Sequence, residues 1–70
     1  MTDTVKQLIQ LTNAQGITQA ELARRLDVTP VAVWRWFNGD RNPNIKYVEK
    51  WALAIGYRYV IVWNGGEAIE

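Results

Sequence analysis

The stretch from Thr18 to Gly39 reads TQAELARRLDVTPVAVWRWFNG and contains two helix-start signals. Thr18 and Glu21 form a capping-box pattern, in which the Thr18 hydroxyl accepts from the third helical N–H while the Glu21 carboxylate reaches back. Thr29 and Pro30 form a second start, because Thr caps helices well and Pro fits the first helical position. The pattern predicts two short helices joined by about three residues, a helix-turn-helix.

The second helix of this pair, expected over residues 30–38, has two different faces. At 100° per residue, one apolar arc is expected to pack inward. Its members are Pro30, Val33, Trp36 and Phe37. The opposite arc carries Val31, Trp34, Arg35 and Asn38, which we expect to face solvent. A guanidinium can donate to guanine O6 and N7, and Val31 can contact a thymine methyl, so this arc suits a DNA major groove.

One further helix is expected before this pair and one after it. Residues 3–15 carry an apolar stripe at helical spacing, with Gly16 suited to the left-handed residue that follows. Residues 44–55 carry another stripe, capped by Asn44 and ended by Gly56. The two stripes are Val5, Leu8, Ile9 and Thr12, and then Ile45, Val48, Ala52 and Ile55. We therefore predict a mainly α domain over residues 1–56, with four helices and room for a fifth.

Residues 57–63 have a different character and predict a β-strand. They read YRYVIVW, which is rich in β-branched and aromatic residues, and Asn64-Gly65-Gly66 closes them. A lone strand has two unpaired edges, so we expect a twin strand from a second subunit, antiparallel about a two-fold axis. Residues 57–70 would then be a dimerisation arm, with the contact carried by Tyr57, Tyr59, Val60, Ile61, Val62 and Trp63. The alternatives are a strand that lies on its own helices or a disordered tail.

Residues 18–39 resemble the helix-turn-helix of the phage Cro/repressor-like (XRE) family, and VEKWALAIG at residues 48–56 resembles the helix that follows it there. The resemblance covers roughly residues 5–57. It implies a compact lambda-repressor-like DNA-binding domain, usually a dimer on a pseudo-palindromic operator. It also assigns buried roles to Leu22, Ala23, Leu26, Val28, Val33 and Trp36. Asp27 stands where the family commonly has Gly, and Asp tolerates the left-handed conformation better than most residues.

The resemblance and the helical phase together give a set of candidate DNA contacts. Base contacts are expected from Thr29, Val31, Trp34, Arg35 and Asn38. Phosphate contacts are expected from Gln19, Arg41, Asn42 and Asn44. In the family pattern Pro30 also falls at a contact position, where it offers no hydrogen-bonding side chain. Two alternatives stay open: Trp34 could lap over a neighbouring helix, and Arg24 and Arg25 could be solvated surface charges.

Composition excludes several kinds of chemistry. The 70 residues contain no Cys, His or Ser, so the usual nucleophiles, their His base, and zinc or haem sites built from His and Cys are missing. We expect no enzyme, no cofactor and no metal. The net charge is only +1, and no apolar run is long enough to span a membrane. We expect a cytoplasmic, nucleoid-associated protein of a bacterial or phage-infected cell.

These patterns lead to one main functional hypothesis and one alternative. The main hypothesis is a sequence-specific transcriptional regulator, a Cro-like repressor that binds double-stranded DNA at an inverted-repeat operator as a dimer. The alternative is an antitoxin-like or adaptor module whose strand engages another protein, with DNA binding secondary. A hetero-complex at the strand and DNA affinity that depends little on salt would favour the alternative.

Overall fold

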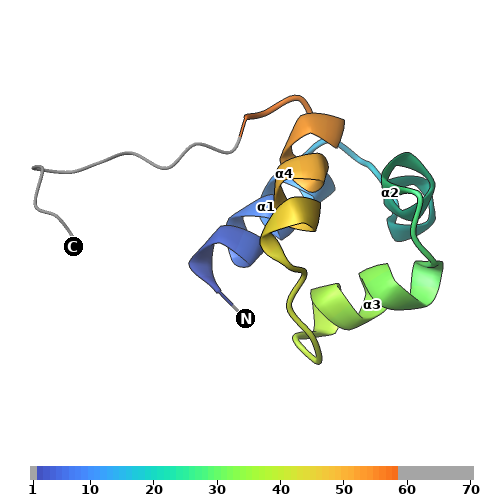
Figure 1. Cartoon of the computed structure of the whole chain (residues 1–70). Coiled ribbons are helices and arrows are strands. Elements are labelled where there is room, and N and C mark those ends of the chain that lie inside the picture. Colours follow the sequence, from blue (N-terminus) through green and yellow to red (C-terminus); the bar gives the residue numbers. More distant parts are fainter. Residues whose placement is uncertain (1, 59–70) are drawn as a thin grey trace, which may run out of the picture.

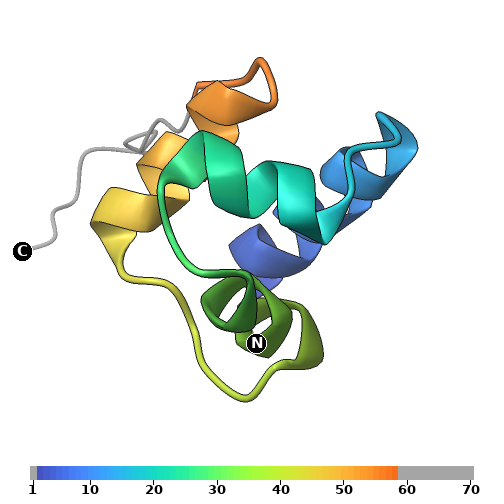
Figure 2. The same ribbon diagram turned by 90° about the vertical axis from the view of Figure 1, so that its right-hand side faces the viewer.

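The computed structural model describes residues 2–58, which form four α-helices. These are α1 (Asp3–Ala14), α2 (Gln19–Leu26), α3 (Pro30–Asn38) and α4 (Ile45–Ala54). α1 and α4 lie side by side, α2 packs against α4, and α3 lies across one edge of the molecule (Figure 1). A view turned by 90° shows α3 nearly end-on below α2 (Figure 2). The mainly α, four-helix prediction is thus confirmed for this part of the chain.

Each helix begins at a polar cap. The side-chain oxygens of Thr2, Thr18, Thr29 and Asn44 accept from the backbone N–H three residues further along. Each cap thereby satisfies an N–H that has no partner inside the helix. The cap at Asn44 leaves that residue just outside α4, so the helix is slightly shorter than the sequence predicts.

A residue with positive φ lies at the end of each helix or one position after its C-cap. These residues are Gly16, Asp27, Gly39 and Gly56. The N–H of Asp40 donates to the Arg35 carbonyl and the N–H of Gly39 to the Trp36 carbonyl, which is the Schellman pattern. Asp27 makes the same kind of ending with φ 58, so the carboxylate residue takes the left-handed turn position expected of it. Local sequence therefore sets both ends of every helix.

A single hydrophobic core lies between the four helices. It contains Val5 and Leu8 of the predicted stripe of α1, with Thr12 fully buried beside them, whereas Ile9 is only half-buried and packs against it. Its members are Val5, Leu8, Leu22, Ala23, Leu26, Val33, Trp36, Val48, Trp51, Ala52 and Ile55. Val28 is only half-buried and packs on this cluster from the turn after α2.

The Trp51 side chain, 0% exposed, links three of the helices. Its indole N–H donates to the Thr12 hydroxyl on α1 over 2.9 Å, and that hydroxyl donates to the Leu8 carbonyl over 2.6 Å. Its ring stacks on Trp36 and Phe37 of α3, with centroids 5.8 and 5.7 Å away. Such aromatic pairs contribute roughly 0.5–1.5 kcal/mol each beyond the area they bury. Trp51 therefore fixes where α3 sits relative to α1 and α4.

Two predicted core positions are wrong. Ile45 is 56% exposed, because it is the first residue of α4 and the buried face of that helix turns instead toward Trp51. Pro30 is exposed as well. It is the first residue of α3, and Ala32, two positions further along, packs against the core.

The predicted strand falls largely beyond the described residues. Tyr57 and Arg58 follow α4 without regular secondary structure and are exposed. Residues 59–63, with the predicted dimer contacts Tyr59, Val60, Ile61, Val62 and Trp63, lie outside the described part. Within residues 2–58 there is no strand.

We predict that Thr12→Val lowers the free energy of unfolding by about 1–3 kcal/mol, because it leaves the buried Trp51 N–H without an acceptor. Urea unfolding followed by circular dichroism measures this change. Thr4→Val is the matched control, since Thr4 is only half-buried on the same helix and its hydroxyl makes no hydrogen bond within residues 2–58. Equal losses in the two variants would contradict the role of this hydrogen bond.

Candidate nucleic-acid interface

The turn between α2 and α3 presents the start of α3 to solvent. The Val28 N–H donates to the Ala23 carbonyl over 3.0 Å, which closes α2 and directs the chain into α3. Thr29 then caps α3, its Oγ accepting from the Ala32 N–H over 3.2 Å. The Thr29 hydroxyl keeps its own proton, so it remains able to donate to an oxygen outside the protein.

The outward face of α3 carries the side chains expected there. Val31 is 58% and Trp34 is 52% exposed, and Arg35 and Asn38 are exposed. The inward face is held by Val33 and Trp36 in the core. The predicted division of α3 into two faces is therefore confirmed, apart from Pro30. Exposure is what base contact requires, and it leaves these side chains free to meet another molecule.

Trp34 lies outside the aromatic stacking of the core. The aromatic cluster contains Trp36, Phe37, Tyr47 and Trp51, and no described ring stacks on Trp34. Trp34 is not one of the buried residues of the core either. About half of the indole thus faces solvent beside Val31.

The residues expected to meet phosphates lie around α3, on other segments. Gln19 is the first residue of α2 and is half-buried. Arg41 and Asn42 are exposed in the loop after α3. Asn44 uses its Oδ1 to accept from the Tyr47 N–H over 3.1 Å, so only its amide N–H groups remain for an outside acceptor. The loop therefore offers a guanidinium and two amides.

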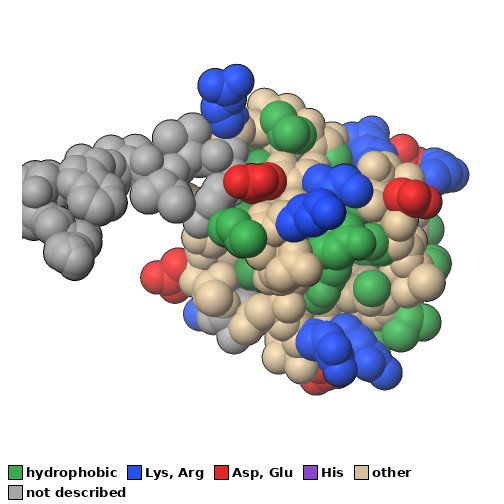
Figure 3. Space-filling model, viewed as in Figure 1, with side chains coloured by type: hydrophobic (Ala, Val, Ile, Leu, Met, Phe, Trp, Pro, Cys, Tyr) green, Lys and Arg blue, Asp and Glu red, His purple; other side chains and the backbone are tan. Residues whose placement is uncertain are grey.

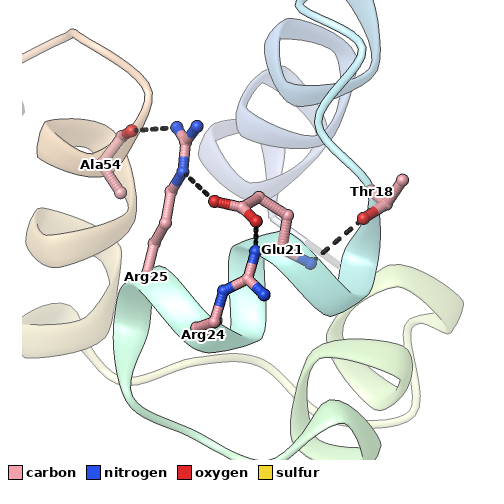
Figure 4. A network of polar contacts seen from close by, with 5 residues as sticks. All are labelled: Thr18, Glu21, Arg24, Arg25 and Ala54. Atoms are coloured by element: carbon pink, nitrogen blue, oxygen red, sulfur yellow. Dashed lines mark hydrogen bonds and ion pairs between the residues drawn. The ribbon is translucent and has the colours of Figure 1, made fainter.

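The basic residues of α2 form a different network (Figure 4). The Glu21 carboxylate pairs with both Arg24 and Arg25, and does not reach back to its own helix start as the capping box predicts. Arg25 also donates to the Ala54 carbonyl over 2.9 Å, which ties α2 to the end of α4. Because two guanidinium groups lie close by, the Glu21 carboxylate has better partners than a backbone N–H. Arg25 is thus a structural residue. Of the two hydrogen bonds of the capping box, only the one from the Glu21 N–H to the Thr18 hydroxyl forms.

The basic side chains near α3 are left without ion pairs by this arrangement. Within residues 2–58, the side chains of Arg35, Arg41 and Lys46 make no ion pair, since both ion pairs there involve Glu21. Lys and Arg side chains lie over α2 and along the lower edge that contains α3, with hydrophobic side chains between them (Figure 3). This surface combines free positive charge with apolar groups.

A comparison with protein-family models decides the classification. The model of the helix-turn-helix family matches residues 5–61, which is most of the chain. The chain belongs to the Cro/XRE-like helix-turn-helix family. The family is one of DNA-binding, non-enzymatic domains. Its helix-turn-helix is formed by α2 and α3, whose outward face is the surface described above. Searches of curated proteins and of solved structures found no match.

Other parts of this helix-turn-helix domain offer little chemistry. An open hollow of about 360 Å³ lies along α1 and α4, and its only charged lining residue is Arg58. In the described part of the chain, no cluster of three or more His, Cys, Asp or Glu could hold a metal ion. None of the helices there has the length and apolar character that crossing a membrane requires.

The residues that position α3 in this domain were only partly identified from sequence. Trp51 and Tyr47 were missed, although both contribute rings to the cluster that holds Trp36. The signal for Trp51 is its spacing, three residues after Val48 and four before Ile55, which places it on the buried stripe of α4. The Thr12 acceptor and the Arg25 bond to α4 carry no comparable local signal.

Proposed function

We propose that this protein is a Cro-like repressor that binds an inverted-repeat operator through the outward face of α3. The observation that carries the proposal is the exposure of Val31, Trp34 and Arg35 on a helix whose other face is locked into the core. A helix in this position can enter a major groove without any rearrangement of the domain.

Arg35 is proposed as the main base contact. Its guanidinium is exposed and makes no ion pair with another described residue, so it can donate two hydrogen bonds to guanine O6 and N7. Thr29, Val31, Trp34 and Asn38 are the neighbouring base contacts in this proposal. The Thr29 hydroxyl and the Asn38 amide supply hydrogen bonds, and the two apolar side chains supply surface contact.

Phosphate contacts are proposed for Gln19, Arg41, Asn42 and Asn44. Gln19 lies at the start of α2, where free backbone N–H groups favour an anion. Arg41 and Asn42 are exposed next to the end of α3, where such folds approach the DNA backbone. These contacts would hold the domain in register and give affinity for DNA of any sequence.

Dimerisation is proposed for residues 57–70, with residues 1–56 as the DNA-binding domain. The support is the sequence of residues 57–63, an apolar and β-branched segment without a second strand of similar length in the chain. Paired strands about a two-fold axis would set two α3 helices about 34 Å apart, one turn of B-DNA. Each protomer would then bind half of an inverted repeat.

We predict that Arg35→Ala and Arg41→Ala weaken binding in different ways. Arg35→Ala should lower specific affinity by roughly 1–3 kcal/mol and relax the choice at one base pair, because a bidentate base contact is lost. Arg41→Ala should weaken binding to all sequences and reduce the dependence of affinity on salt, because a phosphate contact is lost. Fluorescence anisotropy with a selected duplex and a random duplex, at several salt concentrations, measures both effects.

Lys6→Ala is the control for these two variants, since it also removes one exposed positive charge, from α1. It should change neither specificity nor the salt slope. An equal loss on selected and random DNA in Arg35→Ala would make Arg35 a phosphate contact and refute its proposed role.

We predict that Val60→Pro dissociates the dimer, because proline removes a backbone donor from the proposed strand ladder. Sedimentation of the purified full-length chain measures this directly. Ala68→Pro, which lies beyond residues 57–63, should leave the dimer intact. A Val60→Pro chain that still sediments as a dimer would rule out pairing through this strand.

A further inference from the structure

The exposed apolar side chains of α3 lie next to each other. Val31 and Trp34 are 58% and 52% exposed and three residues apart, so they are neighbours on the helix surface. Pro30, one position before Val31, is exposed too. The start of α3 therefore presents a continuous apolar patch, defined by Pro30, Val31 and Trp34, which we call the α3 apolar patch.

The aromatic stacking of the core does not include this patch. The ring stacking of α3 is made by Trp36 and Phe37, and Trp34 takes no part in it. Apolar surface left in water is unfavourable, and it is most useful where a partner offers apolar surface in return. A partner of matching chemistry is therefore expected at this point of α3.

The DNA major groove offers one apolar group on its base edges, the C5 methyl of thymine. Uracil has the same hydrogen-bonding edge without the methyl, so the methyl alone can be tested. Arg35 lies four residues after Val31, on the adjacent part of the same face. A side chain on the α3 apolar patch would thus meet a base next to the one that Arg35 contacts.

We propose that Val31 and Trp34 together read a thymine C5 methyl beside the guanine bound by Arg35. This inference rests on the DNA binding proposed above and names the chemical group that sets the sequence preference. In this arrangement the Val31 side chain contacts the methyl on one side, and the exposed part of the Trp34 indole contacts it on the other. The half-site of the operator therefore contains a thymine next to a guanine, and its methyl is removed from water on binding.

The experiment uses the full chain and a duplex selected from a random DNA pool. Each thymine of one half-site is replaced in turn by deoxyuridine, and the Kd is measured by fluorescence anisotropy. At one position next to the guanine read by Arg35, the affinity should fall about fourfold, which corresponds to roughly 0.8 kcal/mol for one buried methyl. Replacement of the other thymines in that half-site should have no such effect.

Protein variants show whether the α3 apolar patch is responsible. In Val31→Ala and in Trp34→Ala, the thymine and deoxyuridine duplexes should bind with nearly equal affinity. Both side chains are exposed, so both variants should fold, which circular dichroism verifies. Leu53→Ala is the matched control, since it truncates an apolar side chain that is 66% exposed on α4, and it should keep the fourfold preference.

Three results would overturn the inference while leaving operator binding in place. These are a selected half-site without thymine, equal binding of all the deoxyuridine duplexes by the unaltered protein, and a thymine preference that survives in both Val31→Ala and Trp34→Ala. Failure of the random pool to yield any preferred duplex would instead overturn the proposed function, and this inference with it.

Discussion

The stacking of Trp51 on the α3 rings is the contact on which the position of α3 depends. The Trp51 indole stacks on the rings of Trp36 and Phe37, and its N–H donates to the Thr12 hydroxyl on α1. A buried N–H without an acceptor costs roughly 1–3 kcal/mol, so the bond to Thr12 holds the indole in one orientation. Since α3 is docked on this indole, its opposite face is fixed toward solvent.

Short helices can be held this way because their ends are specified locally. α2 and α3 have only 8 and 9 residues, which is too short for a stable helix in isolation. Polar caps at Thr18 and Thr29 begin them, and left-handed residues at Asp27 and Gly39 end them. Tertiary packing then determines only which faces of the helices are in contact. Because the ends of α3 are set locally and one face is packed in the core, its other face can carry exposed apolar and cationic side chains.

The features that the sequence predicted correctly are the ones decided within a few residues. The helix pair, its caps and the left-handed Asp27 depend on hydroxyls, amides and backbone preferences close by in the chain. Helical phase likewise placed Val31 and Arg35 outside. For the candidate interface, sequence thus identified the exposed face of α3 and the family to which the chain belongs.

The failures are decided by partners far along the chain. Pro30 and Ile45 lie on apolar stripes, yet each is the first residue of its helix and is exposed. Glu21 matches a capping box, but Arg24 and Arg25 compete for its carboxylate, and Arg25 is held in place by the Ala54 carbonyl 29 residues away. The spacing of apolar residues shows which face of a helix is buried, but not how far along the helix that burial extends. Burial at the helix ends therefore could not be predicted.

Nuclear magnetic resonance of the full chain during titration with a selected duplex tests the role of α3 most directly. We expect the largest backbone amide shift changes over residues 29–38 and 41–44, with the Trp51 indole N–H resonance nearly unchanged, because α3 meets DNA as an already docked helix. Shift changes concentrated on α1 and α4, with residues 29–38 unaffected, would contradict this account.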